Sequence, residues 1–401
     1  MLNSTCFGRS QAAGCRTGQT RSSAALRTEK RGAVAGIKKA YQRFNNYPLE
    51  IVIDGDKAMV SWHIVAANAE GAPIDAKGAN LFTIRKGKIA YMANFHDTVP
   101  FTHPTLVKPT APQPVAEPKP APNVKLQRYE ATAAQFFVNA FLIETPNGVV
   151  AVDATIANST ARALREKIDK EIRKPLLAVL VTHGHPDHFT GLGELTKGLD
   201  VPILATQGAI DFARREDAIK GDVAIAIFGD DYPRKRMFPN KAVAGGTIHT
   251  FDGVDFKVED YGPGESDADA LWYFVDADGA RHAFIGDIAH NHMHCFFRDG
   301  HTHEWIASLH RLANTFDHDA ILYSGHGEPA GTEIVSWHKG YVEAFVGTLH
   351  SMLGDRNSLT EKEKAKLVAK MQSYLPNDKL LFLMMYELDE TIKLLKERGI
   401  V

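Results

Sequence analysis

The order of hydrophobic and polar positions divides the chain into two kinds of sequence. Between residues 49 and 95, apolar runs such as LEIVI and AMVSWHIVAAN are separated by turns that contain Gly55 and Gly87, a pattern that predicts β-hairpins. The preceding stretch, GIKKAYQRF (36–44), predicts a short helix. From residue 125 onward, strand-like runs alternate with helical stretches, and past Ile334 the pattern is helical. The second region therefore predicts an α/β fold with a helical C-terminal extension.

A proline-rich segment separates the two regions. Proline stands at nearly every second or third position from Pro109 to Pro122, which excludes helix and favours an extended spacer. We therefore predict four parts, which are a disordered tail (1–35), a small N-terminal domain (36–105), a linker (106–123) and a larger domain (124–401).

The small N-terminal region resembles a known domain in three stretches. GDKAMVSW, GANLFTIRKGKIAYM and the closing FHDT are similar to the second half of a SnoaL-like, ketosteroid-isomerase-like domain. The resemblance implies a partial α+β cone-like domain. The spacing of His63, His96 and Asp97 does not demand a second catalytic pocket, so a packing or dimerisation role is favoured. This domain is the candidate interface for a homodimer.

The composition is that of an ordinary globular protein and narrows the expected partners. The 401 residues are 44% hydrophobic, and 46 basic against 48 acidic residues give a net charge of −2. This balance gives no reason to expect nucleic acid or an anionic membrane as a partner, so a small-molecule substrate is predicted. No apolar run is long enough to span a bilayer.

The cysteines and the N-terminal tail bear on location. Cys6, Cys15 and Cys295 are too few and too scattered for a disulfide framework, which fits a reducing, cytoplasmic compartment. The first 35 residues are rich in Arg, Ser and Thr, as organelle transit peptides are. Their apolar residues are too sparse for the apolar face of such a peptide, so a disordered tail is favoured and organelle targeting is the alternative.

One short stretch concentrates metal-binding side chains. THGHPDHFTG (182–191) follows the apolar run LLAVLV. In an extended loop His183 and His185 point the same way and can hold one metal ion. Asp187 and His188 turn the other way and can serve a second, and this donor set suits zinc, iron or manganese. The alternative is a polar helix N-terminus capped by Asp187 and His188.

Two other apolar strands end in side chains that bind metals. AFIGD ends with Asp287, and ILYS leads into GHG with His326. Each alone is equally consistent with a turn or a surface loop. Because strand ends converge in α/β folds, the three positions together predict one site.

This set of motifs resembles the metallo-β-lactamase-fold hydrolases over roughly residues 125 to 335. The resemblance implies an αβ/βα four-layer sandwich and two divalent metal ions, with zinc favoured over manganese or iron. It implies that His183 and His185 hold the first ion, and that Asp187 and His188 hold the second. It assigns Asp287 as the bridging aspartate and His326 as the last histidine.

The chain departs from that family's pattern at Glu265. The family usually has a histidine in a GPGH-type turn, whereas YGPGESDAD places Glu265 there. Alkylsulfatase-like members also use glutamates at their metals, so we favour Glu265 as a ligand. A carboxylate oxygen would shift the preference toward manganese or iron. The alternative is that Glu265 supports other ligands, with Asp267 or Asp269 nearby.

Other polar residues near these motifs are expected to have supporting roles. Asp153 in VAVDAT is interpreted as a structural acid rather than a ligand. Most histidines of AHNHMHCFFRDGHTHEW should be ordinary packing or polar residues, with one or two at most in contact with substrate; they are His290, His292, His294, His301 and His303.

These residues predict a metal-dependent hydrolase that activates water to cleave an ester-type bond. Lactones, thioesters, carboxylic esters, sulfate esters and phosphate esters are the candidate substrates. Asp187 is the predicted catalytic residue, which orients the attacking water and passes a proton to the leaving group. Alternatives are an iron-dependent oxidoreductase of the same fold and, less favoured, a non-catalytic scaffold.

The insertion 222–240 leaves two interpretations of substrate charge. Its basic residues Arg234, Lys235 and Arg236 either overhang the pocket and favour an anionic substrate or belong to a solvated loop. The sequence does not decide between them.

Overall fold

The computed structural model describes residues 41–54, 56–68, 73–85, 88–96 and 116–401. The chain forms two compact units, Met1–Val115 and Ala116–Val401. Each unit is described by itself. None of the helices within the described residues is both long enough and apolar enough to cross a membrane.

The N-terminal unit contains a four-stranded antiparallel sheet in the order β1-β2-β3-β4. Its strands are β1 (Tyr41–Asp54), β2 (Lys57–Asn68), β3 (Pro73–Arg85) and β4 (Lys88–His96). The predicted hairpins are confirmed, since Asp54 pairs with Lys57 and Arg85 with Lys88.

The helix predicted for residues 36–44 is wrong over residues 41–44. Tyr41 pairs with Asn68 and Phe44 with Ala66, so this segment extends β1. A ladder of this length satisfies its backbone donors and acceptors, which outweighs a weak local helical preference. Asp97, residues 36–40 and most of the linker lie outside the described residues. In the described part of this unit there are strands and no helix, so the cone-like domain stays a prediction.

The larger unit is built on two mixed sheets. The first has the order β10-β9-β8-β7-β6-β5 and the second the order β11-β12-β13-β14-β15. The strands of the first sheet are β5 (Lys125–Glu130), β6 (Asn139–Glu144), β7 (Val149–Val152), β8 (Leu176–Leu180), β9 (Ile203–Thr206) and β10 (Lys241–Val243). Those of the second sheet are β11 (Ile248–Phe251), β12 (Val254–Gly262), β13 (Asp269–Val275), β14 (Arg281–Gly286) and β15 (Ile321–Ser324). The alternation of strands and helices predicted from residue 125 onward is confirmed.

Alternating side chains place the strands β6 to β9 of the first sheet in two apolar clusters. In β6, Phe141 and Ile143 join the cluster that also contains Trp272 and Phe284 of the second sheet. Leu142 faces the opposite way, into a cluster with residues of the adjoining helices. Because strand side chains alternate between faces, β6 is apolar on both sides and therefore buried on both.

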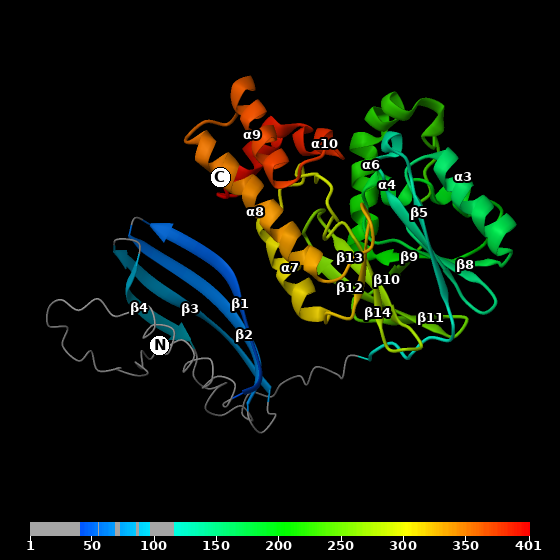
Figure 1. Cartoon of the computed structure of the whole chain (residues 1–401), viewed down its shortest axis with the longest axis horizontal. Coiled ribbons are helices and arrows are strands. Elements are labelled where there is room, and N and C mark those ends of the chain that lie inside the picture. The colour runs from blue at the N-terminus through cyan, green and yellow to red at the C-terminus, as the bar shows by residue number, and fades with distance from the viewer. Residues whose placement is uncertain (1–40, 55, 69–72, 86–87, 97–115) are drawn as a thin grey trace. The chain divides into compact units, whose positions relative to one another are not determined.

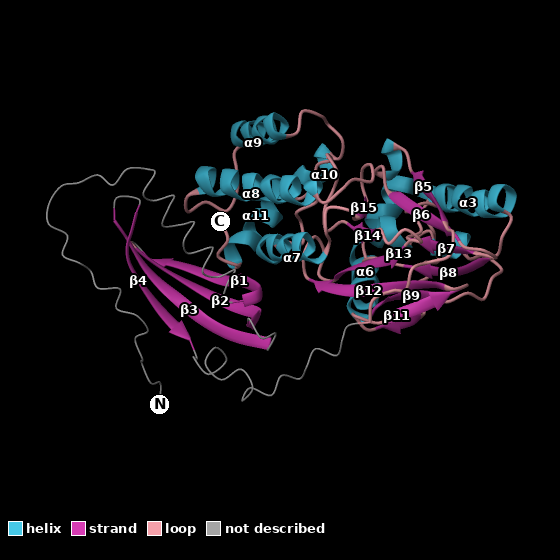
Figure 2. Cartoon of the chain, turned by 60° about the horizontal axis from the view of Figure 1, so that its bottom comes forward, coloured by secondary structure: helices cyan, strands magenta, loops and turns pink. Residues whose placement is uncertain are grey.

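Helices cover the outer faces of both sheets (Figures 1 and 2). Those beside the first sheet are α3 (Asn158–Glu166), continued by the π-helix η2 (Lys167–Ile172), α4 (Pro186–Phe189), α5 (Leu192–Leu195) and α6 (Gln207–Phe228). Those beside the second are α7 (Thr302–Thr315), α8 (Glu333–Leu353), α9 (Glu361–Tyr374), α10 (Leu381–Met385) and α11 (Leu388–Glu397). Two short 3-10 turns, η1 (Ala133–Gln135) and η3 (Gly229–Asp231), complete the described elements.

The C-terminal helices confirm the helical pattern past Ile334. α9 begins with a reciprocal cap, in which Thr360 Oγ1 accepts from the backbone N–H of Glu363 and the Glu363 side chain accepts from the Thr360 N–H. Ile392 and Leu395 of α11 and Leu367 and Met371 of α9 are buried in the cluster that covers the second sheet. The extension is thus part of the same core as the predicted site.

Candidate metal centre

All seven predicted ligands meet in one buried cluster. They come from the loop after β8, the turn after β12 and the ends of β14 and β15. Four groups of three donor atoms each lie within 4.8 Å of one another; they are His183–His185–Glu265, His183–His188–Asp287, Asp187–His188–His326 and Asp287–His290–His326. The convergence of strand ends expected from the sequence is therefore present, and His290 joins it.

Two glycines allow the loops to approach this closely. A Cβ on Gly184, between His183 and His185, would lie 2.6 Å from the backbone nitrogen of Ala213 in α6. A Cβ on Gly325, in the loop that carries His326, would lie within contact radius of the Asp287 carboxylate. A larger residue at either position would displace backbone or ligands.

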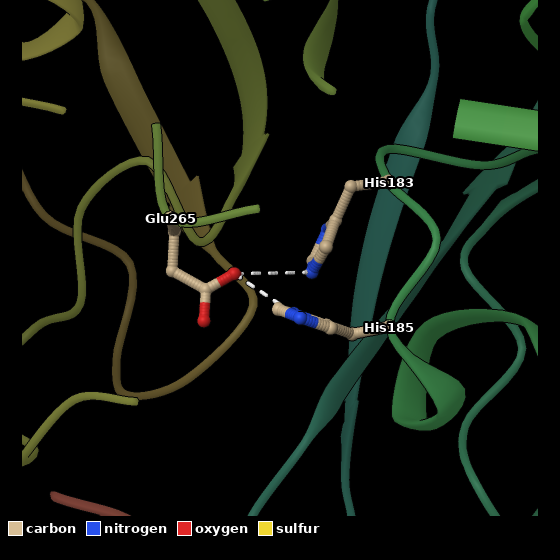
Figure 3. Close-up of side chains that lie close together, drawn as sticks. All are labelled: His183, His185 and Glu265. Carbon is tan, nitrogen blue, oxygen red and sulfur yellow. Dashed lines mark ion pairs between the residues drawn. The ribbon is translucent and has the colours of Figure 1, made fainter. Parts of the chain in front are cut away.

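Glu265 lies with the first histidine pair. Its Oε2 is 2.8 Å from His185 Nδ1 and 3.7 Å from His183 Nε2 (Figure 3). Figure 3 shows the carboxylate pointing into the space between the two rings. The other two acids of this turn face elsewhere. Asp269 accepts hydrogen bonds from the backbone N–H of Glu265 and the Ser266 hydroxyl, while Asp267 pairs with Arg215 and His301.

The second group surrounds Asp287. Its Oδ2 is 3.5 Å from His188 Nε2, 3.4 Å from His326 Nε2 and 4.0 Å from His183 Nε2. Asp187 Oδ2 lies 3.2 Å from His326 Nε2 and 3.8 Å from His188 Nε2. Asp287 therefore lies between the two groups, as the family resemblance implies for a bridging carboxylate.

His290 is a member of the cluster that the sequence did not single out. Its Nε2 is 3.3 Å from Asp287 Oδ2, and the residue is buried. The signal was its position three residues after Asp287, but the stretch contains four other histidines. His294 bonds the hydroxyl of Tyr341 and a backbone carbonyl, and His292 stacks on Trp337, so the expectation of packing roles fits these two.

Each imidazole of the cluster has its outer nitrogen held by a hydrogen bond. His188 Nδ1 donates to Asp153 at 2.8 Å, and His185 Nε2 donates to Asp299 at 2.9 Å. The remaining three bonds run from His183 Nδ1 to the Thr182 hydroxyl, from His326 Nδ1 to the carbonyl of Phe136, and from His290 Nδ1 to the carbonyl of His294. These partners hold the outer nitrogen and orient each ring, so that the inner nitrogen points toward the cluster.

Several inner donor atoms are buried without a well-aligned hydrogen bond, although Glu265 Oε2 lies 2.8 Å from His185 Nδ1. They are His183 Nε2, His188 Nε2, His290 Nε2, Glu265 Oε2 and Asp287 Oδ1. Buried polar atoms are normally hydrogen-bonded, so five orphans in one cluster need an explanation. The set of nitrogen and carboxylate donors fits divalent metal ions such as zinc, manganese or iron.

The ligand-free cluster holds protons that metal ions would displace. Burial raises the pKa of Glu265 to about 8, although His185 acts to lower it. Burial lowers the pKa of His326, but Asp287 and Asp187 outweigh it and raise the pKa to about 10. For Asp187 burial acts to raise the pKa, yet His188 and His326 hold it well below its usual range. Mutual charge compensation therefore keeps a closely packed group of ionisable residues folded.

Asp153 contacts the cluster through the outer nitrogen of His188 and is not one of the grouped donors. Its carboxylate accepts from His188 Nδ1 and from the backbone and hydroxyl of Thr182. Asp299 has the equivalent place beside His185, and its contact was not predicted because 114 residues separate the two in the chain.

The basic residues of the insertion 222–240 do not line the pocket beside the cluster. Residues 222–228 continue α6, and Arg234 pairs with Asp230 while Arg236 pairs with Asp217. Neither arginine lines the pocket beside the cluster. The lining of the pocket therefore favours the solvated-loop interpretation for Arg234 and Arg236.

Comparison with known proteins bears on this domain. Residues 133–326 match the model of the Metallo-beta-lactamase superfamily. Ribonuclease J of Sinorhizobium meliloti is 36% identical over 85 residues, which are 20% of this chain and 14% of the relative. Metallo-beta-lactamase type 2 of a Bacillus species is 22% identical over 204 residues, which are 47% of this chain and 66% of the relative.

Solved structures also resemble the chain. The sec-alkylsulfatase Pisa1 from Pseudomonas sp. is 19% identical with a TM-score of 0.48, over 69% of this chain and 50% of that chain. The chain thus spans only part of the length of these relatives. The matched region carries the buried cluster and every strand of the two sheets except β5, and residues 133–326 are a metallo-beta-lactamase superfamily domain.

Proposed function

We propose that the protein is a metal-dependent hydrolase that cleaves an ester-type bond. It would bind two divalent ions, and zinc is favoured over manganese or iron. The observation that carries this proposal is the single buried cluster in which five imidazoles turn their free nitrogens toward three carboxylates. A structural cluster of this kind would be expected to pair its donors in well-formed hydrogen bonds, whereas here five buried atoms lack one.

The distances support a division of ligands between two ions. His183, His185 and Glu265 would hold the first ion, and Asp187, His188 and His326 the second. Asp287 would contact both, because its Oδ2 is within 4.0 Å of histidines from each group. A divalent ion held there would lower the pKa of water and polarise the bond under attack.

Asp187 is the residue proposed to handle the proton. Its side chain is 13% exposed, whereas the side chains of Glu265 and Asp287 are 2% and 4% exposed. Asp187 also lines the pocket beside the cluster. Because neighbouring histidines hold its pKa low, Asp187 is ionised at neutral pH and can orient an attacking water and pass its proton to the leaving group.

A substrate panel with metal control tests this function. We expect hydrolysis of at least one class among lactones, thioesters, carboxylic, sulfate and phosphate esters, with loss on chelation and recovery on adding zinc or manganese. Asp187→Asn should lower kcat by about 100-fold or more with little change in fold. Glu304→Ala, an exposed acid of α7, is the matched control. Stoichiometric iron with oxygen uptake and no hydrolysis would contradict the proposal in favour of an oxidoreductase.

A further inference from the structure

A pocket adjoins the metal-binding cluster. Six residues of the cluster form part of its wall; they are His185, Asp187, Glu265, Asp287, His290 and His326. A molecule that fills the pocket therefore brings one end to the proposed ligands and to Asp187.

The rest of the pocket is mainly apolar and comes from two distant helices. The end of α6 supplies Val223, Ile227 and Phe228, and α10 supplies Phe382 and Leu383. Val223, Ile227 and Phe382 are 45%, 61% and 52% exposed. Large apolar side chains that stay exposed beside a polar centre are typical of ligand-binding surfaces.

Aromatic rings connect the two helices across the pocket. The ring of Phe136 is 5.5 Å from that of Phe228 in α6 and 5.5 Å from that of Phe382 in α10. Phe136 has the unusual φ of 64°, and its carbonyl accepts the hydrogen bond from His326. One residue thus contributes to both the apolar wall and the orientation of a proposed ligand, at a backbone conformation that bulky residues rarely adopt.

The pocket offers little to a charged ligand. Lys220 is the one basic residue among those lining it, and its Nζ is paired with Glu216 and lies 3.8 Å from Asp299. An anionic tail would have to compete with these carboxylates, whereas an apolar tail would displace water from apolar side chains.

We infer that the substrate is an ester with an uncharged, apolar chain or ring that lies between α6 and α10, with the scissile bond at the cluster. This inference rests on the proposed hydrolase function and narrows its substrate class. The occupant is the substrate itself, because the apolar walls are continuous with the proposed ligands and with Asp187.

Binding of linear alkanohydroxamates to the zinc-loaded full-length chain tests the inference. A hydroxamate head chelates metal, so only the tail differs along the series of two, six and ten carbons. Burying each methylene should tighten binding by about three- to fourfold. Because the pocket is partly open, we expect a gain of at least about tenfold from two to ten carbons by calorimetry.

Two substitutions to glutamate test where the alkyl tail of the hydroxamate binds, and a third serves as the control. Ile227→Glu and Phe382→Glu should abolish most of the chain-length gain and leave acetohydroxamate affinity unchanged. Ile219→Glu is the control, because Ile219 lies on the same helix and is 64% exposed but does not line the pocket. All three positions are exposed, so folding should be retained, which circular dichroism checks.

The outcomes separate this inference from the proposed function. Equal affinity for all chain lengths, or a gain that survives Ile227→Glu and Phe382→Glu, overturns the inference and leaves the hydrolase proposal standing. If the chain takes up no metal and acetohydroxamate does not bind, the proposed function fails. Binding of the ten-carbon compound that Ile227→Glu removes would then still support an apolar ligand.

Discussion

The two halves of the cluster differ in closure and in ligand type. The half formed by His183, His185 and Glu265 is almost fully buried and is backed by Asp299, itself near Lys220. The other half contains the partly exposed Asp187 and has an additional histidine, His290. Under the proposed function, the first half would fix an ion, whereas Asp187 of the second half would meet water and substrate.

The two halves share the carboxylate of Asp287, and its removal should have the largest effect on metal content and hydrolysis. Asp287→Ala removes the group between both sets of histidines and leaves several imidazoles without their charge partner. We expect loss of most bound metal and a fall in the rate of hydrolysis of more than about 100-fold. Changing a residue that only hydrogen-bonds a metal ligand typically lowers activity by about 10- to 100-fold. Metal analysis and initial rates measure this. Asp278→Ala, an exposed turn residue, is the control, and wild-type metal content in Asp287→Ala would refute the shared role.

The supporting carboxylates should separate the halves. Asp299→Asn weakens the hold on His185, and Asp153→Asn weakens the hold on His188. Each change should reduce the affinity of its own metal site by about 10- to 100-fold. Competition with a chromogenic chelator resolves the two binding steps. Equal loss at both steps from either variant would show that the halves act as one unit.

The protons of the metal-free cluster predict how metal affinity depends on pH. With a pKa of about 10, His326 is protonated at pH 7 when no metal is bound, and an ion needs its inner nitrogen deprotonated. Metal uptake at pH 7 should therefore release protons, and affinity should fall as pH falls, by about tenfold per unit for each proton displaced. Calorimetry in buffers of different ionisation enthalpy counts the protons. Uptake without proton release would contradict the charge state inferred for His326.

His290 should have the smallest effect of these residues. Within the cluster, its Nε2 lies 3.3 Å from the shared Asp287. His290→Gln should weaken the second ion by less than about tenfold and change the visible spectrum of the cobalt-substituted protein. His292→Gln, whose ring stacks on Trp337, is the control. An unchanged cobalt spectrum would mean that His290 lies outside the coordination sphere.

The sequence predicted the parts of this site that depend on periodic structure. Asp287 and His326 stand directly after apolar strands, so their convergence follows from the strand pattern. Glu265 was found through a family resemblance rather than a local pattern. In contrast, His290 and Asp299 lie in the irregular segment between β14 and α7, where no periodicity marks a side chain that points inward.

The apolar pocket could not be predicted from the sequence for a different reason. Residues 222–228 read as part of an insertion with basic residues, and their helical continuation of α6 turned apolar side chains toward the cluster. The opposite wall, α10, lies more than 150 residues further along the chain. Only tertiary packing brings the two helices to the same pocket. The same limit explains residues 41–44, where pairing with β2 decided the conformation.

Metal stoichiometry in the wild-type chain and in Glu265→Ala tests the central claim most directly. Glu265 stands where the resemblance to metallo-β-lactamase-fold hydrolases leads us to expect a histidine, and its Oε2 lies 2.8 Å from His185 Nδ1. Two divalent ions per wild-type chain and about one in Glu265→Ala is the result that a two-ion centre with Glu265 as a ligand predicts. A single ion in the wild type, or an unchanged metal content in Glu265→Ala, would contradict it.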